Sequence, residues 1–309
     1  MICNPFVAVK PDRLGGGAPP VCLATDAMGT RFELVLLGND PARLRAAGES
    51  ALDLINDWDR RLSWFSPGSV LSHVNARAAD GPLPIDRELH SLLVLSREVW
   101  RDSGGAFDIT IAPLMVAWGL RSAPPAGRPD LETAQSCVGM DGVEILDDPP
   151  TVRFLRPGMS LDLGSIAKGA ALDAAAAVLR ECGVTSALLH GGTSSVVAIG
   201  SPPGRDSWPV AIETGHGDRP VVHLCDTSLS VSAPRGRTAM TDRGPVGHII
   251  DPRTGLPAAR AGTAAVIHKS GALADAWSTA LLVLGSRPHA MPHDMTAILD
   301  LHAPHENAA

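Results

Sequence analysis

The sequence contains no tyrosine, and its aromatic side chains are six tryptophans and five phenylalanines among 309 residues. Any aromatic contact to a ligand must therefore come from a ring without a phenolic hydroxyl. No apolar run reaches the ~18 residues that a membrane-spanning helix requires, and residues 1–10 lack the basic and apolar segments of a signal peptide. From the sequence as it stands we expect a cytoplasmic protein, or a periplasmic one if the native chain starts upstream.

Cysteine and clustered basic residues are also scarce. The five cysteines are odd in number, far apart and never spaced as CxxC, which argues against a zinc knuckle or a disulfide framework and favours core packing. The 26 Lys and Arg residues against 33 Asp and Glu give a formal charge of −7, without a basic run for nucleic acid or an anionic membrane. A phosphate-bearing ligand would need backbone N–H groups, a single cation or a metal.

Hydrophobic periodicity predicts both helices and strands. The predicted helices cover residues 41–62 with Asp40 as N-cap, 87–103 with Asp86 as N-cap, 164–182 and 273–284. The predicted strands cover residues 31–37, 143–146, 152–155, 185–189, 196–199, 209–212, 221–224 and 229–231. Because no regular βαβ period is present, we expect an α+β or mixed α/β fold and exclude a Rossmann fold and an eight-fold barrel.

Composition divides the chain into three parts. Residues 1–20 are rich in glycine and proline and are expected to form a disordered arm. Residues 21–287 are expected to hold the folded part, and a length of 309 residues with 45% apolar content allows one large domain or two. Residues 288–309 are expected to form a short tail rich in histidine and proline.

Two glycine-containing segments are each open to two interpretations. Ala27-Met28-Gly29-Thr30 precedes a strand, so Gly29 allows either a simple bend or a close approach of the backbone to a ligand. Gly104-Gly105-Ala106-Phe107-Asp108 follows a helix, where a glycine pair is usually a stop signal. Asp108 is equally well placed to cap a helix over residues 110–118 or to bind a ligand.

The segment Asp162-Leu163-Gly164-Ser165-Ile166-Ala167-Lys168-Gly169 combines a helix start with a cation. A helix that begins at Gly164 and Ser165 would present free N–H groups to an anion. Lys168 in the first turn opposes the helix dipole, which favours a bound anion nearby. The Walker A pattern is absent, so the segment is interpreted as a phosphate site of another kind.

A fourth polar region joins residues 248–257 to residues 274–279. Residues 251–255 have the composition of a turn, with Pro252 at its second position. Asp275 and Thr279 place a carboxylate and a hydroxyl one helical turn apart on an otherwise apolar helix. Two such oxygens suit Mg²⁺, which takes one or two carboxylates with waters and substrate phosphates. The spacing alone leaves Asp275 equally open to a role as a helix N-cap.

Taken in order, these segments resemble the flavin transferases of the ApbE family, the FAD:protein FMN transferases. The motifs are MGT at 28–30, LSWFSPGSVLSHVN at 62–75, GGAFDITIAPLMVAWG at 104–119, LDLGSIAKGAALD at 161–173, GG at 191–192, HIIDPRTGLP at 248–257 and ADAWSTALLVLG at 274–285. The resemblance implies a single large ApbE-like (T-fold-like) domain. It also implies a Mg²⁺-dependent transferase that moves FMN from its substrate FAD onto a threonine of an acceptor flavoprotein with a Ser-Gly-Ala-Thr-like motif, releasing AMP.

The resemblance implies a role for individual residues. The metal ligands would be the carboxylate of Asp275, the hydroxyl of Thr279 and the backbone carbonyl of Ser165. The FAD site would include Met28, Phe65, Ala106, Phe107, Asp108, Asp162, Lys168 and Ile249. His248 is our own candidate for proton transfer because its ordinary pKa is about 6.5, although a histidine beside a strand is often a structural hydrogen-bonding residue.

The sequence departs from the family pattern at several positions. Thr193 stands where the family usually has an aspartate, and the run Ser230-Val231-Ser232 stands where Ser-Gly is more typical. Phe65 stands where a tyrosine commonly stacks on the flavin, so stacking is expected to survive without the hydroxyl. The alternatives to an FMN transferase are therefore a non-catalytic FAD-binding protein and an enzyme that hydrolyses FAD to FMN and AMP.

Overall fold

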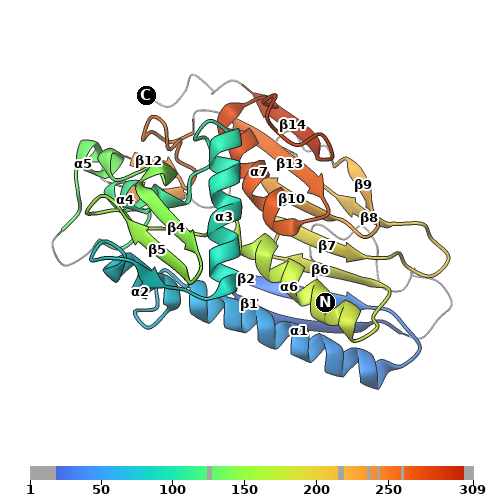
Figure 1. The fold of residues 1–309 in the computed structure, drawn as a ribbon. Coiled ribbons are helices and arrows are strands. Elements are labelled where there is room, and N and C mark those ends of the chain that lie inside the picture. Colours follow the sequence, from blue (N-terminus) through green and yellow to red (C-terminus); the bar gives the residue numbers. More distant parts are fainter. Residues whose placement is uncertain are drawn as a thin grey trace.

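The computed structural model describes residues 19–123, 127–214, 219–234, 238–241, 244–258 and 261–302. Its largest element is a seven-stranded sheet with the order β1-β2-β6-β7-β10-β13-β14, in which all neighbouring strands are antiparallel. The strands are β1 (Val21–Ala27), β2 (Thr30–Leu36), β6 (Ala187–Gly191), β7 (Ser195–Ile199), β10 (Ser228–Ser232), β13 (Ala261–His268) and β14 (Thr296–His302). One face is covered by α1 (Pro41–Leu62), α6 (Ala167–Glu181) and α7 (Gly271–Leu284) (Figure 1).

A hairpin of β8 (Trp208–Ala211) and β9 (Val221–Leu224) covers the opposite face. The Trp208 side chain is buried there in one cluster with Leu188 of β6 and Val196 of β7. Helices on one face of an antiparallel sheet are typical of α+β domains. The predicted fold class is therefore confirmed.

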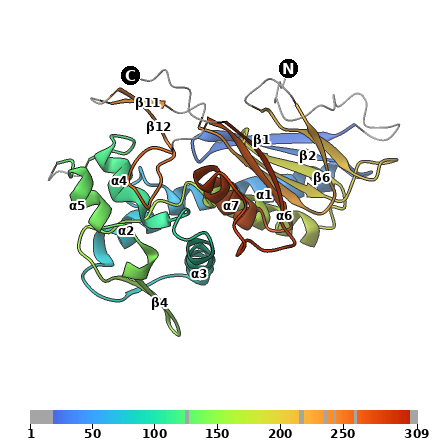
Figure 2. The same ribbon diagram turned by 90° about the horizontal axis from the view of Figure 1, so that it is seen from above.

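The remaining elements lie beside the large sheet and form a smaller lobe (Figure 2). Its helices are α2 (Val70–Arg77), α3 (Arg87–Asp102), α4 (Ala112–Ala117) and α5 (Leu131–Ser136), with single 3₁₀ turns at Ile109–Ile111 and Met140–Gly142. A three-stranded sheet joins β3 (Leu83–Pro84), β5 (Pro150–Phe154) and β4 (Val143–Asp147), and a further hairpin joins β11 (Thr238–Thr241) to β12 (Gly244–Gly247). Among the described residues, no helix combines the length and the apolar character needed to cross a membrane.

The two helices with the strongest sequence signals form as predicted. Asp40 caps α1 by accepting a hydrogen bond from the N–H of Arg43, and Asp86 caps α3 in the same way through Leu89. The apolar face predicted for α1 is buried along its length: Leu44, Ala47, Ala51, Ile55, Trp58 and Leu62. A local cap and an apolar stripe together therefore suffice to define these helices.

Several predicted boundaries were wrong by two residues or more, among them those of the strands predicted over 152–155 and 185–189, which are β5 (Pro150–Phe154) and β6 (Ala187–Gly191). Residues 164–166 form a turn, and α6 begins only at Ala167, whereas α7 begins two residues earlier than expected, at Gly271. Residues 288–309 are not only a tail, because β14 lies within them and pairs with β13 from His302 to Thr296. Residues 1–18 of the predicted N-terminal arm lie outside the described part of the chain.

Core packing of the cysteines is confirmed only in part. Cys137 is buried and Cys182 is half-buried, whereas Cys22 and Cys225 are exposed; all four are free thiols. Cys3 lies outside the described residues. The exposed pair shows that scarcity and irregular spacing do not by themselves place a cysteine in the core.

Candidate active site

Helices α6 and α7 each cap the start of the other. Asp173 of α6 accepts hydrogen bonds from the backbone N–H groups of Gly271 and Ala272, at 2.7 and 3.1 Å, where α7 begins. Asp275 of α7 accepts a hydrogen bond of 3.1 Å from the N–H of Gly169 in the first turn of α6. Two carboxylates thus occupy the positively polarised ends of the two helices.

Asp275 does not cap its own helix, which was one of the two roles that spacing left open. The N-cap of α7 is Ser270, whose side chain accepts a hydrogen bond from the N–H of Leu273. Asp275 lies beyond this first turn and is only 3% exposed. Its position is therefore set by contacts with α6 and not by the local sequence.

Gly169 and Gly271 allow the two helices to approach this closely. A Cβ built on Gly169 would overlap the carbonyl oxygen of Gly271, and one built on Gly271 would lie 2.9 Å from the carbonyl oxygen of Gly169. These carbonyl oxygens are backbone atoms, which move only if a helix moves, and the Cβ on Gly271 would also lie 2.8 Å from Asp173 Oδ1. The capping of each helix by an aspartate of the other therefore depends on glycine at both positions.

Serine hydroxyls of β10 face the same part of α7. Ser230 Oγ donates a hydrogen bond of 2.9 Å to Asp275 Oδ1. Ser232 Oγ lies 2.8 Å from Ser278 Oγ and 3.2 Å from Thr279 Oγ1. Residues two apart on a strand share a face, so these serines form a polar row against α7. Sequence reasoning noted this run only as a departure from the family; the alternation of its serines was the signal that it missed.

Lys168 lies beside Asp275, and Ser165 precedes it in the chain. Lys168 Nζ lies 3.8 Å from Asp275 Oδ2, and Ser165 stands in the turn of residues 164–166 that leads into α6. Within the described ranges no three His, Cys, Asp or Glu side chains gather into a metal-binding group. One carboxylate, the hydroxyl of Thr279 and a backbone carbonyl are a donor set of oxygens that fits Mg²⁺ with substrate phosphates.

Two tight turns of the large sheet lie side by side near this helix pair. A Cβ built on Gly192, in the β6–β7 turn, would overlap Thr30 Oγ1 at the end of the β1–β2 turn. The β6–β7 turn also reaches β10, where the carbonyl oxygen of Ser194 accepts a hydrogen bond of 2.7 Å from the N–H of Val231. Thr193 is exposed on this turn, so the position of the missing aspartate borders the region around Asp275.

The β1–β2 turn holds Met28 in an unusual conformation. Met28 and Gly29 have φ angles of 50° and 67°, as a two-residue hairpin turn with two left-handed residues requires. Asp59 of α1 accepts a hydrogen bond of 2.8 Å from the N–H of Met28. A hollow of about 390 Å³ lies here, lined by residues 26–31 and Asp59. Asp59 therefore supports the turn, a role that the sequence did not suggest.

Phe65 and Asp162, both predicted to line the FAD site, are connected through Arg121. Phe65 is 73% exposed, and its ring centroid lies 5.7 Å from Arg121 Cζ. Arg121 Nε donates a hydrogen bond of 2.7 Å to Asp162 Oδ2, while Asp162 Oδ1 accepts one of 2.8 Å from the N–H of Gly164. Arg121 was missed because it stands in a loop with no periodic or motif signal.

The segment Ala106-Phe107-Asp108 is buried. Asp108 caps the 3₁₀ turn at Ile109–Ile111, because its Oδ1 accepts hydrogen bonds from Thr110 N at 2.8 Å and Thr110 Oγ1 at 2.6 Å. Burial raises the pKa of Asp108 to about 6 in spite of these bonds. Ala106 and Phe107 are also buried, so any contact of this segment with a ligand would have to use its backbone.

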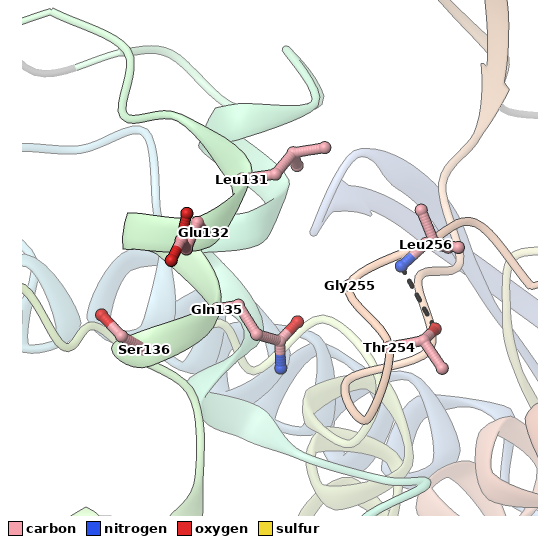
Figure 3. A pocket seen from close by; sticks show the side chains of 7 residues that line it. All are labelled: Leu131, Glu132, Gln135, Ser136, Thr254, Gly255 and Leu256. Atoms are coloured by element: carbon pink, nitrogen blue, oxygen red, sulfur yellow. Dashed lines mark hydrogen bonds between the residues drawn. The ribbon is translucent and has the colours of Figure 1, made fainter.

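His248 and Ile249 are half-buried at the start of the loop of residues 248–257. Trp118 Nε1 donates a hydrogen bond of 2.7 Å to the carbonyl oxygen of Gly255, and Gln135 Nε2 donates one of 2.6 Å to that of Pro252. Figure 3 shows the pocket of about 460 Å³ between this loop and α5. It is lined by Leu131, Glu132, Gln135, Ser136, Thr254, Gly255 and Leu256, and so by none of the predicted site residues.

The predicted residues fall into three groups. Asp275 lies against the first turn of α6 beside Lys168, and Thr279 follows Asp275 one turn later on α7. Ser165 stands in the turn before α6, and Phe65 is linked to Asp162 by Arg121. Met28 and Ile249 pack against the core cluster that contains Phe107 and the apolar residues around the starts of both helices. Several distant motifs of the sequence therefore converge on one region, where α6, α7 and β10 meet the smaller lobe.

Two buried groups, Asp108 and His190, make the free energy of unfolding depend on pH in opposite directions. Burial raises the pKa of Asp108 to about 6. Its contribution to the free energy of unfolding is therefore fully present below the pKa that Asp108 has in the unfolded chain, and it is lost as the pH rises through 6. Burial lowers the pKa of His190 to about 4. Its contribution to the free energy of unfolding is therefore present above the pKa that His190 has in the unfolded chain, and it is lost as the pH falls through 4. Each shift corresponds to about 3 kcal/mol.

We therefore expect Asp108→Asn and His190→Leu to change the pH profile in opposite directions between pH ~4 and ~6.5. The difference in unfolding free energy, variant minus wild type, should rise with pH for Asp108→Asn and fall with pH for His190→Leu. Urea unfolding at several pH values measures both slopes, and differences from wild type cancel the other titrating groups. Parallel profiles in all three proteins would contradict these two assignments.

Comparison with known proteins identifies the family. The model of the ApbE family matches residues 28–295. The FAD:protein FMN transferases of Rhodobacter capsulatus and Treponema pallidum are 34% and 31% identical to this chain over 280 and 264 residues, which cover 87% and 79% of it. The matched regions span 73% of the Treponema protein but only 52%, about half, of the Rhodobacter protein.

Solved structures agree with these relatives. The ApbE protein of Thermotoga maritima is similar with a TM-score of 0.77 at 26% identity, covering 86% of this chain and 87% of that one. The flavinyl transferase ApbE of Pseudomonas stutzeri, in its apo form, has a TM-score of 0.73 at 28% identity and covers 86% and 84%. The fold, the ordered motifs and the family match over residues 28–295 lead to one conclusion: the chain belongs to the ApbE family.

Proposed function

We propose that this protein is a Mg²⁺-dependent flavin transferase that moves FMN from FAD onto a threonine of an acceptor flavoprotein and releases AMP. The observation that carries the proposal is the convergence on Asp275 of the first turn of α6, the serine row of β10 and the cation of Lys168. Relatives named FAD:protein FMN transferase, matched over most of this chain, support the same reaction.

The metal would be held by Asp275, by the hydroxyl of Thr279 and by the backbone carbonyl of Ser165. When bound, Mg²⁺ would supply positive charge to the pyrophosphate oxygens of FAD. Lys168 adds a second positive charge, 3.8 Å from Asp275 Oδ2. These groups neutralise the substrate without any covalent intermediate on the protein, which is what attack on a pyrophosphate mainly requires.

The remaining residues would position FAD. Phe65 offers an exposed aromatic face to the flavin ring, and Met28 forms part of the wall of a hollow at the β1–β2 turn. Asp162 fixes the turn before α6, while Ile249 contributes an apolar side chain from the 248–257 loop. Ala106, Phe107 and Asp108 would act through their backbone, since their side chains are buried.

In the transfer step, the threonine oxygen of the acceptor forms a bond to the phosphorus of the FMN half, and the bond from that phosphorus to the AMP oxygen breaks. The threonine hydroxyl loses its proton, and AMP leaves as a phosphate anion. His248 is our candidate for accepting this proton, because imidazole titrates near neutral pH and His248 adjoins Ile249 of the proposed site.

Thr193 favours a second candidate function. An exposed threonine on the β6–β7 turn supplies no carboxylate where the family usually has one. Loss of this group would impair activation of the acceptor more than binding of FAD. The alternatives are therefore a binding protein for FAD, or a slow pyrophosphatase in which water replaces the threonine.

One incubation distinguishes the three functions. The protein is mixed with FAD, Mg²⁺ and an acceptor protein carrying Ser-Gly-Ala-Thr, and a matched acceptor with alanine for threonine serves as control. We expect an FMN adduct on the threonine acceptor alone, detected by mass spectrometry and flavin fluorescence, with one AMP for each adduct. AMP without an adduct would indicate hydrolysis, and bound FAD without either product would indicate a binding protein.

A further inference from the structure

Phe65 differs from the other described phenylalanines in being exposed. Phe32, Phe107 and Phe154 are buried in the core, whereas Phe65 is 73% exposed on the loop between α1 and α2. An exposed ring on a loop gains little from burial and has several rotamers open to it. Something other than core packing must therefore hold it in one orientation if it is to serve as a platform for a ligand.

Arg121 is placed to do this, because a buried carboxylate fixes the guanidinium. Its Nε donates to Asp162 Oδ2 at 2.7 Å, and its Nη1 donates to the carbonyl oxygen of Leu120 at 3.1 Å. Asp162 is only 6% exposed and is held in turn by the N–H of Gly164 and by its own N–H, which donates to the carbonyl oxygen of Ile109 at 2.7 Å. The guanidinium is thus anchored in the protein before it meets the ring.

The contact between Arg121 and Phe65 has the geometry of a cation–π pair, with Cζ 5.7 Å from the ring centroid. A planar guanidinium can bind a carboxylate along its edge and stack on a ring with its face at the same time. Lysine cannot do both, because its ammonium group is a point charge. One face of the ring is therefore occupied by Arg121, which leaves the other face for a planar ligand.

We propose that Arg121 is a positioning residue, which holds Phe65 as the stacking platform for the isoalloxazine ring of FAD. This inference deepens the proposed function and rests on it. Arg121 acts through Phe65 and not by direct contact with the substrate. It links the stacking ring to Asp162 and hence to the turn of residues 164–166 before α6, so that the flavin end of FAD is held at a fixed place relative to Ser165.

A double-mutant cycle tests the proposal, with FAD affinity measured by quenching of flavin fluorescence. We expect Arg121→Met to raise the dissociation constant about three- to tenfold and Phe65→Ala to raise it at least as much. The double variant should bind no more weakly than Phe65→Ala, because Arg121 has no effect once the ring is gone. Independent, multiplicative effects of the two changes would overturn the positioning role.

Two further variants separate positioning from stability. Arg121→Lys keeps a positive charge beside Asp162 but not the planar stack, so it should fold and still lose most of the FAD affinity that Arg121→Met loses. Arg180→Met removes a guanidinium beside Asp226, 3.8 Å away and close to the far end of α6, and should bind FAD as wild type does. Wild-type affinity in Arg121→Lys would overturn the proposal.

Failure of the positioning role is distinguishable from failure of the proposed function. If wild type binds FAD and labels the acceptor while the Arg121 variants bind FAD equally well, the positioning role is wrong and the proposed function stands. If wild type itself binds no FAD, both are wrong. Visible circular dichroism of the bound flavin gives a second readout, because a displaced platform changes the spectrum even at saturating FAD.

Discussion

Replacing Asp275 with asparagine is expected to lower FMN transfer by at least about a thousandfold while leaving the protein folded. The amide oxygen of asparagine can still accept the hydrogen bond from Gly169, so the start of α6 stays capped. The negative charge is lost, however, and with it the only carboxylate in the proposed donor set for Mg²⁺. Labelled acceptor is quantified by mass spectrometry, and Mg²⁺ affinity by calorimetric titration.

Asp173→Asn is the matched control, because Asp173 caps α7 as Asp275 caps α6 but belongs to no proposed ligand set. This variant is expected to lose stability and to keep both Mg²⁺ affinity and transfer. Chelation of the metal should reduce wild-type transfer to the level of Asp275→Asn and have little further effect on that variant. Transfer at the wild-type rate in Asp275→Asn would refute the metal assignment.

Gly169→Ala is expected to destabilise the protein by about 3 kcal/mol and to weaken Mg²⁺ binding at the same time. The new Cβ would overlap the carbonyl oxygen of Gly271, so α6 and α7 must move apart. Separation of the helices breaks the hydrogen bond from Gly169 to Asp275 and so moves the first turn of α6 away from the proposed metal ligand. Urea unfolding measures the loss of stability, and calorimetric titration measures the loss of Mg²⁺ affinity.

Gly68→Ala provides the comparison for this variant. A Cβ on Gly68 meets no atom within 4 Å, so its effect should stay within about 0.5 kcal/mol with Mg²⁺ affinity unchanged. A Gly169→Ala protein as stable as Gly68→Ala would show that the helices tolerate separation. The dependence of the site on this glycine pair would then be wrong.

Elements specified by nearby residues were predictable from the sequence. Asp40 and Asp86 lie directly before the helices that they cap, and each helix carries its own apolar stripe. Strands were predicted over residues 185–189 and 196–199 because both stretches are apolar, and they correspond to β6 and β7. The ligand motifs could be recognised in order because each occupies a short stretch of chain.

Features created by distant contacts were not predictable in this way. Gly164 and Ser165 look like a helix start, but the first turn of α6 is satisfied by Asp275 from another helix, and α6 begins only at Ala167. β14 follows a proline-rich stretch and becomes a strand by pairing with β13. Arg121 and Asp59 have no local pattern, since their roles exist only once Asp162 and Met28 are beside them.

The reciprocal capping of α6 and α7 also sets the order in which the protein can be completed during translation. Asp173 and its partner Gly271 are 98 residues apart in sequence, and Gly169 and Asp275 are 106 residues apart. A chain leaving the ribosome N-terminus first exposes α6 long before α7 exists. The first turn of α6 therefore stays uncapped until α7 has been synthesised and has packed against it. Contacts between residues this far apart in sequence form slowly. The proposed site for Mg²⁺ and FAD would thus form among the last events of biosynthesis.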